Sequence, residues 1–382
     1  MPRYLQFAIF FCVAMSIVAG IHYYLWARLL RDTAPSPLVQ RLGTYALVAL
    51  ALSLPTTLAF SRRGSLGALV WVAFIWMGFM FFFFVSLLGT DATYVLTKLG
   101  GPIDAERRTA LRRILAGVAS IVALSAGATA LVEGLRGLRV KEVIVPLKRL
   151  PKAFDGFTIV QLSDVHVGPT IGKGFIEGVV AKVNALSADL VAITGDLVDG
   201  SVARLGPAVA PLGGLQSRHG TYFVTGNHEY YSGAPEWVAE LTRLGVRVLR
   251  NERVAIEQDG QSFDLAGVDD WHSEGQAPGH GADLRGALTG YDRARECVLL
   301  AHQPKQAILA AELGVGLQLS GHTHGGQLWP FTYLVRLQQP FVAGLDRLGE
   351  LFIYTSRGTG YWGQPMRLGA PAEITRITLR AV

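Results

Sequence analysis

Five short polar motifs in this sequence each follow an apolar run, and their side chains are of the types that bind metal ions. The motifs are residues 164–166 (Asp-Val-His), 195–199 (Gly-Asp-Leu-Val-Asp), 226–229 (Gly-Asn-His-Glu), His302, and 321–324 (Gly-His-Thr-His). Carboxylate, imidazole and amide groups are common ligands of divalent cations in catalytic sites. Together the motifs supply enough ligands for two metal ions.

The apolar runs before these motifs predict strands of a covered sheet. Residues 157–162, 190–194 and 222–225 are short, largely apolar runs of the kind found in strands that are buried on both faces. Each motif then lies at the carboxyl end of a strand, which is the edge where open α/β sheets bind their ligands. Glycines at 195, 226 and 321 would allow tight turns and a close approach of backbone to a metal or phosphate.

The spacing within two motifs adds to this prediction. In an extended chain, side chains two residues apart point the same way, so Asp164 and His166 are expected to grip one ion, and His322 and His324 to face one way. Taken singly, the motifs have simpler explanations. An Asp-x-His is often an exposed turn or a hydrogen-bonded pair, and Gly-Asp-x-x-Asp can be an N-cap before a helix. All five in this order favour the metal site.

In this order the motifs resemble the signature of the calcineurin-like metallophosphoesterases, and the resemblance extends over residues 157–379. It implies an α/β fold, a four-layer αββα sandwich of two mixed sheets between helices, with a binuclear metal centre at one edge. It also implies a role for each ligand. The first ion would be held by Asp164, His166 and His324, the second by Asn227, His302 and His322, and Asp196 would bridge the two.

The chemistry of the implied centre explains these residue types. Two divalent ions lower the pKa of a shared water and clamp the oxygens of an in-line phosphoryl displacement. Asn227 would add a ligand without adding negative charge to a site that accepts an anionic phosphate. The ligand set suits Mn, Fe, Zn or Mg, so the sequence leaves the identity of the two divalent metal ions open.

His228 and Asp199 are the candidate catalytic residues. In the family that the sequence resembles, the equivalent of His228 protonates the leaving oxygen, and Asp199 would orient its imidazole. A supporting histidine and a turn residue are the structural alternatives for these two positions. Glu229 is as consistent with a carboxylate in the first turn of a helix as with a participant. Residues 269–272 (Asp-Asp-Trp-His) are explained equally well by a strand-to-loop junction and are left out of the predicted site.

The first third of the chain is poor in acidic residues and rich in Leu, Val, Phe and Ala. Four apolar segments, residues 5–26, 42–60, 66–88 and 114–132, approach or exceed the roughly 20 residues that a helix needs to cross a bilayer. A soluble bundle of wholly buried helices would lack the polar surface to cover them. We predict a four-span transmembrane domain over residues 1–138 and a metallophosphoesterase domain over residues 139–382.

Basic residues bear on the orientation and partners of the protein. Four spans put the N-terminus and the catalytic domain on one side of the membrane. The first and third loops between the spans carry more basic residues than the opposite side, which carries Arg3, Arg62 and Arg63. This comparison leaves out the basic stretch after the fourth span, because that stretch is counted with the folded domain. This count favours an extracytoplasmic catalytic domain. The net charge of +6 lies largely near the spans, where anionic lipid explains it better than nucleic acid.

An aromatic stretch, residues 329–341, follows the last motif. Beside metal ligands it would either rest on the bilayer and admit an acyl chain, or cover a sheet as core. The block Gly-His-Thr-His-Gly-Gly-Gln resembles that of a membrane-associated bacterial subset of the family, which includes enzymes that cleave the pyrophosphate of UDP-diacylglucosamine. The leading hypothesis is a membrane-anchored, metal-dependent phosphodiesterase or pyrophosphatase acting on a lipid or lipid-linked substrate in the bacterial envelope, with membrane lipids as partners.

Two other functions are compatible with parts of the sequence. A transmembrane transport or signalling module with a regulatory phosphoesterase domain would need ionisable residues inside the spans. The segment cores contain essentially none, and His22 lies near the end of the first. A catalytically silent scaffold would be expected to lack a ligand, whereas all are present. The sequence leaves the physiological substrate and the oligomeric state open.

Overall fold

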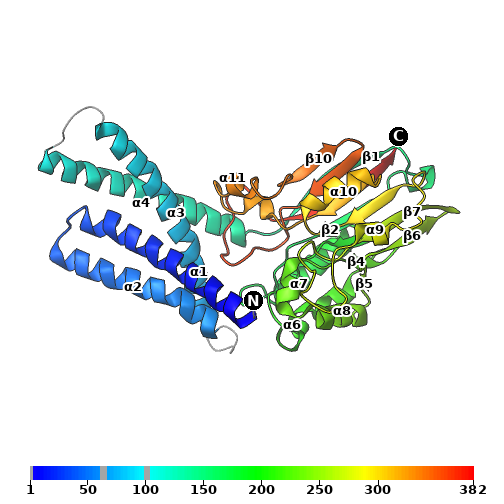
Figure 1. The fold of residues 1–382 in the computed structure, drawn as a ribbon, viewed down its shortest axis with the longest axis horizontal. Coiled ribbons are helices and arrows are strands. Elements are labelled where there is room, and N and C mark those ends of the chain that lie inside the picture. Colours follow the sequence, from blue (N-terminus) through cyan, green and yellow to red (C-terminus); the bar gives the residue numbers. More distant parts are fainter. Residues whose placement is uncertain (1–2, 61–66, 99–103) are drawn as a thin grey trace. The chain divides into compact units, whose positions relative to one another are not determined.

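The structure is a computed structural model that describes residues 3–60, 67–98 and 104–382. The chain divides into two compact units (Figure 1). The first unit ends at Leu135 and also includes residues 363–366, and the second comprises residues 136–362 and 367–382. The predicted domain boundary lies after residue 138, close to the end of the first unit.

Among the described residues, the first unit contains four long helices, each long and apolar enough to cross a membrane. They are α1 (Arg3–Trp26), α2 (Pro37–Phe60), α3 (Gly67–Lys98) and α4 (Ala105–Leu135). The four apolar helices predicted from the sequence are therefore present, and α3 and α4 extend beyond the predicted segments. A short π-helix, η1 (Ala27–Arg31), continues α1. Leu66, Arg62 and Arg63, which entered the sequence predictions, lie outside the described residues.

Apolar side chains of these helices point both inward and outward. Leu25 and Ala73 are fully buried within the unit, whereas Tyr45 and Ile121 are 66% and 68% exposed. Outward apolar side chains are what a lipid-facing helix requires. The buried His22 is internally paired, because its Nε2 accepts the indole hydrogen of Trp76 at 2.9 Å and its Nδ1 contacts the Val18 carbonyl oxygen at 2.8 Å.

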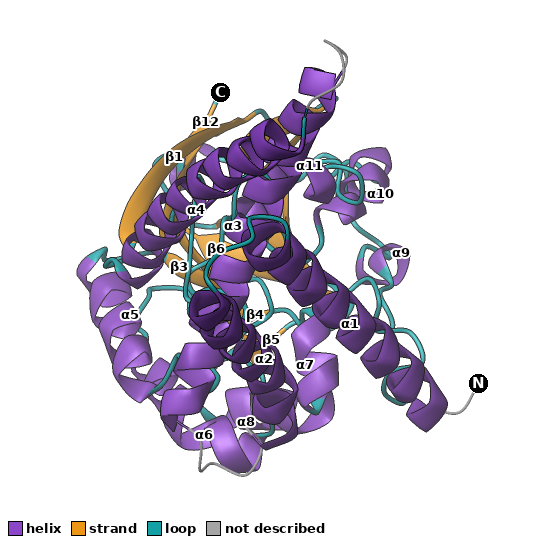
Figure 2. Cartoon of the chain, turned by 90° about the vertical axis from the view of Figure 1, so that its left-hand side faces the viewer, coloured by secondary structure: helices purple, strands orange, loops and turns teal. Residues whose placement is uncertain are grey.

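Two six-stranded mixed sheets form the second unit, in the orders β1-β12-β2-β3-β4-β5 and β10-β11-β9-β8-β7-β6. The strands of the first sheet are β1 (Arg139–Leu147), β2 (Thr158–Leu162), β3 (Leu190–Ile193), β4 (Thr221–Phe223), β5 (Arg247–Val248) and β12 (Glu373–Ala381). Those of the second are β6 (Glu252–Gln258), β7 (Gln261–Gly267), β8 (Cys297–Leu300), β9 (Leu317–Ser320), β10 (Gly344–Leu348) and β11 (Leu351–Thr355). Strand β1 lies at an edge beside β12, as Figure 2 shows.

Three apolar layers hold the sheets and helices together. Ile159, Leu190 and Leu319 belong to the core that lies between the two sheets. Because side chains alternate along a strand, Val160 and Val191 belong instead to the core under the outer helices of the first sheet. These helices are α5 (Lys173–Ala185), α6 (Val202–Val209) and α8 (Ala234–Arg243). Helices α9 (Leu284–Ala287) and α10 (Ala307–Glu312) cover the second sheet, which completes the predicted four-layer sandwich.

The parallel strands of each sheet bring the polar motifs to one edge. Strands β2, β3 and β4 are parallel, as are β8 and β9, so the loops that follow them gather at their carboxyl ends. The first two loops continue the pairing beyond their strands. The Asp164 amide donates to the Gly195 carbonyl at 3.0 Å, and the His166 amide donates to the Asp196 carbonyl at 3.1 Å. Backbone pairing thus sets the relative positions of the first two motifs.

Candidate metal centre

Six of the predicted ligands form two groups, and the ligand atoms within each group lie within 4.8 Å of one another. One group is Asp164, His166 and His324, and the other is Asp196, His302 and His322. In the first group, the two Nε2 atoms of the histidines lie 3.0 Å apart. In the second, His302 Nε2 lies 3.3 Å from His322 Nδ1. Ring nitrogens that converge so closely are arranged as two ligands of one cation.

Hydrogen bonds on the far side of two rings leave the converging nitrogens free to bind metal. The Nδ1–H of His302 donates to the Thr194 carbonyl at 2.7 Å, so its Nε2 presents a lone pair toward Asp196. The Nδ1–H of His166 donates to Asp199 Oδ1 at 3.1 Å, which leaves Nε2 free in the first group. Metal-binding histidines are supported in this way in proteins. The donor atoms therefore fit a pair of divalent cations.

Asn227, the seventh predicted ligand, begins α7 (Asn227–Ser232) beside the second group. The residues on either side of Asn227 both lie against Asp196 of this group. A Cβ at Gly226 would collide with the Asp196 carboxylate, and the His228 amide donates to Asp196 Oδ1 at 2.9 Å. The Oδ1 atom of Asn227 is buried and has no hydrogen-bond partner among the described residues. Such an oxygen costs about 1–3 kcal/mol, and a cation in the second group would satisfy it.

The ligand loops are not extended, which corrects the backbone geometry expected from the sequence. Five ligands have left-handed backbone, a conformation that costs residues with a Cβ about 1–2 kcal/mol each. They are Asp164 (φ 51°), His166 (φ 54°), Asp196 (φ 51°), His322 (φ 72°) and His324 (φ 51°). His322 and His324 consequently serve different groups and do not face one way. Asp164 and His166 do share a group, but strand alternation is not the reason.

Gly195 and Gly226 lie against each other where the loops after β3 and β4 meet. Gly195 has a φ of +83°, and a Cβ there would lie 2.6 Å from the Gly226 nitrogen. A Cβ at Gly226 would meet Asp196, as noted above, so both positions require glycine. The glycines therefore allow these two loops to pack closely, whereas the predicted approach of backbone to a metal or phosphate stays a prediction.

The candidate catalytic pair lies beside the first group. His228 Nδ1 is 2.6 Å from Asp199 Oδ1, and the His228 ring meets the His166 ring edge-on at 4.6 Å between centroids. Burial opposes the charged form of His228, but Asp196 and Asp199 outweigh it and raise the pKa of His228 to about 9. Burial also disfavours charge on Asp199, yet the two histidines hold the pKa of this carboxyl below its ordinary value. The carboxylates thus favour the charged form of His228, and the histidines favour the charged form of Asp199.

Glu229 has a structural role that the sequence left undecided. It is fully buried, and its carboxylate accepts hydrogen bonds from the amides of Gly226 (2.6 Å), Asp196 (3.0 Å) and Leu197 (2.8 Å). Its position three residues after Gly226 matches a capping box, which is the sequence signal that could have revealed it. Glu229 therefore fastens the loop that carries Asp196 to the loop that carries Asn227.

Arg367 is a second supporting residue, which the sequence reasoning missed. Its fully buried guanidinium donates to the carbonyls of Arg357 (2.6 Å) and Ala370 (3.0 Å), and its Nη2 lies 3.2 Å from His324 Nδ1. Burial lowers the pKa of Arg367 to about 10, so the group remains charged at neutral pH. No local motif marks it, because Arg367 is 43 residues from His324 in the sequence.

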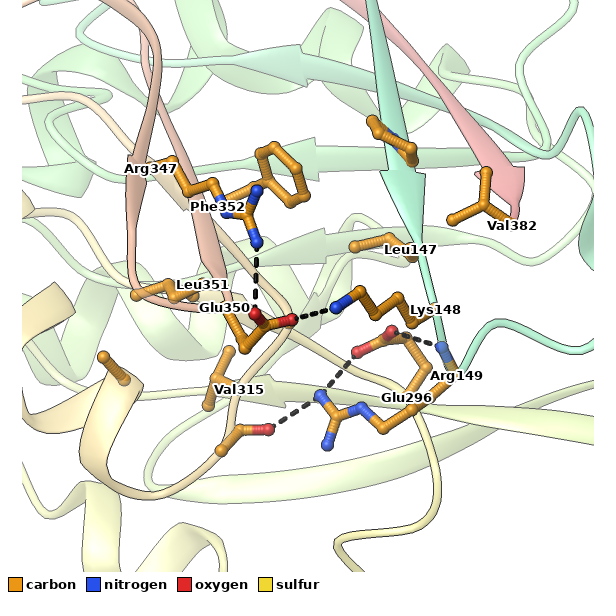
Figure 3. Close-up of a pocket in the computed structure, with 14 residues that line it drawn as sticks. Leu147, Lys148, Arg149, Glu296, Val315, Arg347, Glu350, Leu351, Phe352 and Val382 are labelled. Atoms are coloured by element: carbon orange, nitrogen blue, oxygen red, sulfur yellow. Dashed lines mark hydrogen bonds and ion pairs between the residues drawn. The ribbon is translucent and has the colours of Figure 1, made fainter.

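A pocket of about 460 Å³ lies elsewhere in the second unit, and none of the seven ligands lines it (Figure 3). Its charged side chains pair with one another. Lys148 contacts Glu350 at 2.8 Å and Arg149 contacts Glu296 at 2.9 Å. These ion pairs tie the residues that follow β1 to the second sheet, and the chemistry of the protein is better assigned to the ligand groups.

The chain is similar to several known proteins. The family profile described as calcineurin-like phosphoesterase matches residues 157–326. The chain is 43% identical over 318 residues to "Transmembrane protein with metallophosphoesterase domain" of Bos taurus, covering 79% of this chain and 71% of that protein. It is 31% identical to an uncharacterized metallophosphoesterase of Campylobacter jejuni, over 98% of this chain and 99% of that protein. The solved structure of NAD nucleotidase from Haemophilus influenzae is 20% identical in sequence, with a TM-score of 0.38. The match covers 53% of this chain and 50% of that chain.

Fold and ligand groups together define a metal-dependent phosphoester hydrolase with helices suited to a membrane. The chain belongs to the calcineurin-like metallophosphoesterase family. With its four apolar helices and its transmembrane relatives, it is a membrane protein.

Proposed function

We propose that this protein hydrolyses a phosphodiester or pyrophosphate bond in a lipid or lipid-linked substrate. In this proposal two divalent cations, of Mn, Fe, Zn or Mg, bind to seven ligands, and Asp196 bridges them. The ligands are Asp164, His166, Asp196, Asn227, His302, His322 and His324. The observation that carries the proposal is an exposed aromatic segment that begins five residues after His324, the last of these ligands in the sequence.

Two bound cations would supply an activated water and neutralise charge on the phosphate. The protein's own groups supply the rest of the chemistry. His228 holds one hydrogen toward Asp199 at Nδ1, so the imidazolium presents its other hydrogen at Nε2. This hydrogen is available to the leaving oxygen as the phosphoester bond breaks. Asp199 acts as a positioning residue, because it accepts hydrogen bonds from both His228 and His166.

The exposed segment, which we call the aromatic surface, supports the lipid part of the proposal. It comprises side chains on and around α11 (Thr332–Val335): Trp329, Phe331, Tyr333, Leu334 and Leu337, which are 54%, 45%, 62%, 56% and 81% exposed. This exposure argues against the alternative that the segment is sheet-covering core. Arg336 is the charged residue within residues 329–337, and aromatic side chains with a basic residue suit an anionic lipid interface.

Trp362 lies beside the catalytic pair and is held by Gln327, which stands two residues before the aromatic surface in the sequence. It is 56% exposed, and its ring centroid lies 5.9 Å from that of His228. The Gln327 side chain holds the Trp362 backbone from both sides, donating to its carbonyl and accepting from its amide at 3.0 Å each. An acyl chain on the aromatic surface would therefore extend from a substrate beside His228.

The test compares lipid and soluble substrates of the full-length, manganese-loaded protein in lipid nanodiscs. Bis-p-nitrophenyl phosphate, a nucleotide-diphosphate sugar and a lipid-linked pyrophosphate are offered to the wild type and to Leu334→Ser. We expect Leu334→Ser to lower kcat/KM for the lipid substrate at least about tenfold more than for the soluble ones. The matched control is Ile308→Ser, because Ile308 is 57% exposed on α10. Turnover of soluble diesters without any response to lipid would remove the lipid part of the proposal.

We also propose that the catalytic domain lies on the extracytoplasmic side of the membrane. Arg28 of η1 and Arg112 of α4 both contact Asp32, at 2.7 and 3.0 Å, so basic residues that the sequence analysis counted in the first and third loops lie close together. Basic residues favour the cytoplasmic side. A tag after Val382 should be removed by protease added to intact spheroplasts. A protected tag that is cleaved only after lysis would reverse the orientation.

A further inference from the structure

Five polar side chains lie next to the second ligand group, and the proposed hydrolysis does not use them. They are Asp270, His272, Gln303, Lys305 and Gln339. Gln303 directly follows the ligand His302. The Asp270 amide donates to Thr225 Oγ1 at 3.1 Å, and Thr225 stands two residues before the ligand Asn227. This cluster therefore joins the two loops that carry His302 and Asn227.

One backbone hydrogen bond fixes the orientation of both glutamines. The Lys305 amide, which can only donate, bonds to Gln339 Oε1 at 3.3 Å. The Gln339 amide nitrogen consequently faces Gln303, and it donates to Gln303 Oε1 at 3.4 Å. Gln303 must then present its own nitrogen on the other side, where it donates to Asp270 Oδ2 at 2.9 Å. Each glutamine is thus oriented by its neighbours.

The same nitrogen of Gln303 determines where the hydrogen of His272 lies. Gln303 Nε2 is 2.9 Å from His272 Nδ1, so Nδ1 accepts and the hydrogen of the neutral ring is on Nε2. That Nε2–H faces Lys305 Nζ at a distance of 3.2 Å. An ammonium group can only donate, so two donors point to one place. An anionic oxygen is the group that would accept from both.

The cluster is open to solvent on the lysine side. Lys305 is partly exposed and lies over the Trp271 ring, 5.1 Å from its centroid, while Trp271 is itself 44% exposed. The opposing charge is that of Asp270, whose carboxylate is buried and already accepts from Gln303 and from the His272 amide at 2.8 Å. Lys305 and the His272 ring nitrogen therefore remain directed toward a ligand.

We propose that Lys305 Nζ and His272 Nε2 form a second anion site, which binds a phosphate of the substrate other than the one that is hydrolysed. This inference rests on the proposed function, since the reacting phosphate would occupy the neighbouring ligand groups. It narrows the substrate class to molecules with two linked phosphates, such as a pyrophosphate. A monophosphate diester with two neutral substituents would leave the second site without a ligand.

The kinetic test uses full-length, manganese-loaded protein and two soluble substrates that differ in this feature. A nucleotide-diphosphate sugar has two linked phosphates, and bis-p-nitrophenyl phosphate has one. Lys305→Met should raise KM for the first substrate about tenfold more than for the second, with a smaller change in kcat. Lys305→Arg, which keeps the charge, should recover most of the affinity. Equal changes on both substrates would overturn the second site.

A binding experiment separates this inference from the proposed function. Calorimetry of the same manganese-loaded protein measures the Kd of inorganic pyrophosphate and of inorganic phosphate. Lys305→Met should weaken pyrophosphate binding about tenfold and phosphate binding much less. The control is Lys173→Met, because Lys173 lies on α5 and pairs with Glu177 at the surface. If the wild type cleaves neither substrate, the proposed function fails, and a pyrophosphate Kd unchanged by Lys305→Met would overturn the second site independently.

Discussion

The two ligand groups of the metal centre are supported in different ways. Behind the first group lie charged side chains, with Asp199 accepting from His166 and Arg367 beside His324. Behind the second lies backbone, because His302 is held by the Thr194 carbonyl. The first group should therefore respond to changes of single charges, and the second to changes that loosen its loops. The variants below test this difference, and the largest effect comes first.

Asp196→Ala should damage the whole centre. Asp196 belongs to the second group, and its main chain is also tied to the first group through the His166 amide. We expect bis-p-nitrophenyl phosphate hydrolysis to fall by more than about 1,000-fold, and the metal content of the purified protein to drop. Metal analysis by mass spectrometry checks the second part. A variant that keeps both metals and its activity would contradict a shared role for Asp196.

His228→Ala should separate catalysis from metal binding. His228 is the proposed proton donor and is not one of the seven proposed metal ligands. Its removal should therefore lower kcat by about 100- to 10,000-fold, while the metal content stays that of the wild type. The same assays measure both. A loss of metal in a variant with an unchanged circular dichroism spectrum would show instead that His228 supports the ligands.

Asp199→Asn should weaken the first group selectively. The side-chain amide of the introduced asparagine would present an oxygen or an NH₂ group to His166, and the negative charge that supports the His166 ring would be lost. We therefore expect about a 10- to 100-fold loss in affinity for one of the two metals. Calorimetric titration of metal into the apo protein resolves the two steps. If both steps weakened equally, charged support would not distinguish the first group from the second.

Glu229→Gln should act through the backbone of the second group. An NH₂ group would replace an oxygen that accepts amide hydrogens, leaving buried donors without a partner. We expect the free energy of unfolding to fall by about 1–3 kcal/mol, with a smaller effect on kcat than that of Asp199→Asn. Thermal unfolding in detergent measures the loss. Glu240→Gln, at an ion pair with the exposed Arg243, is the control and should shift stability less.

The sequence predicted those parts of the fold that buried strands specify. Strands β2, β3 and β4 begin and end within two residues of the predicted runs, because a short, continuous apolar segment favours a buried strand. Strands β5 and β10 escaped prediction for physical reasons. Strand β5 contains only Arg247 and Val248, and β10 is largely exposed and carries Asp346 and Arg347. Such strands form because neighbouring strands offer hydrogen bonds, which no local pattern reveals.

The candidate site divides in the same way. The types and order of its polar residues were readable from the sequence, and the structure brings six of the predicted ligands into two groups. The backbone that orients them was not readable, since left-handed conformations at residues such as Asp164 and His322 depend on tertiary contacts. Arg367 and the Gln303–His272 contact likewise join segments that are distant in sequence. Local reasoning finds the ligands and supports that lie within a motif, such as Asp199 and Glu229, whereas a distant support such as Arg367 emerges only from the fold.

A crystal structure of the manganese-loaded protein, with anomalous scattering used to locate the metal, tests the central claim most directly. The account predicts two ions roughly 3.5–4 Å apart, one bound by the group of Asp164 and the other by the group of His302, with the Asn227 amide oxygen as a ligand. A single ion bound elsewhere, or an Asn227 side chain turned away from any metal, would contradict it.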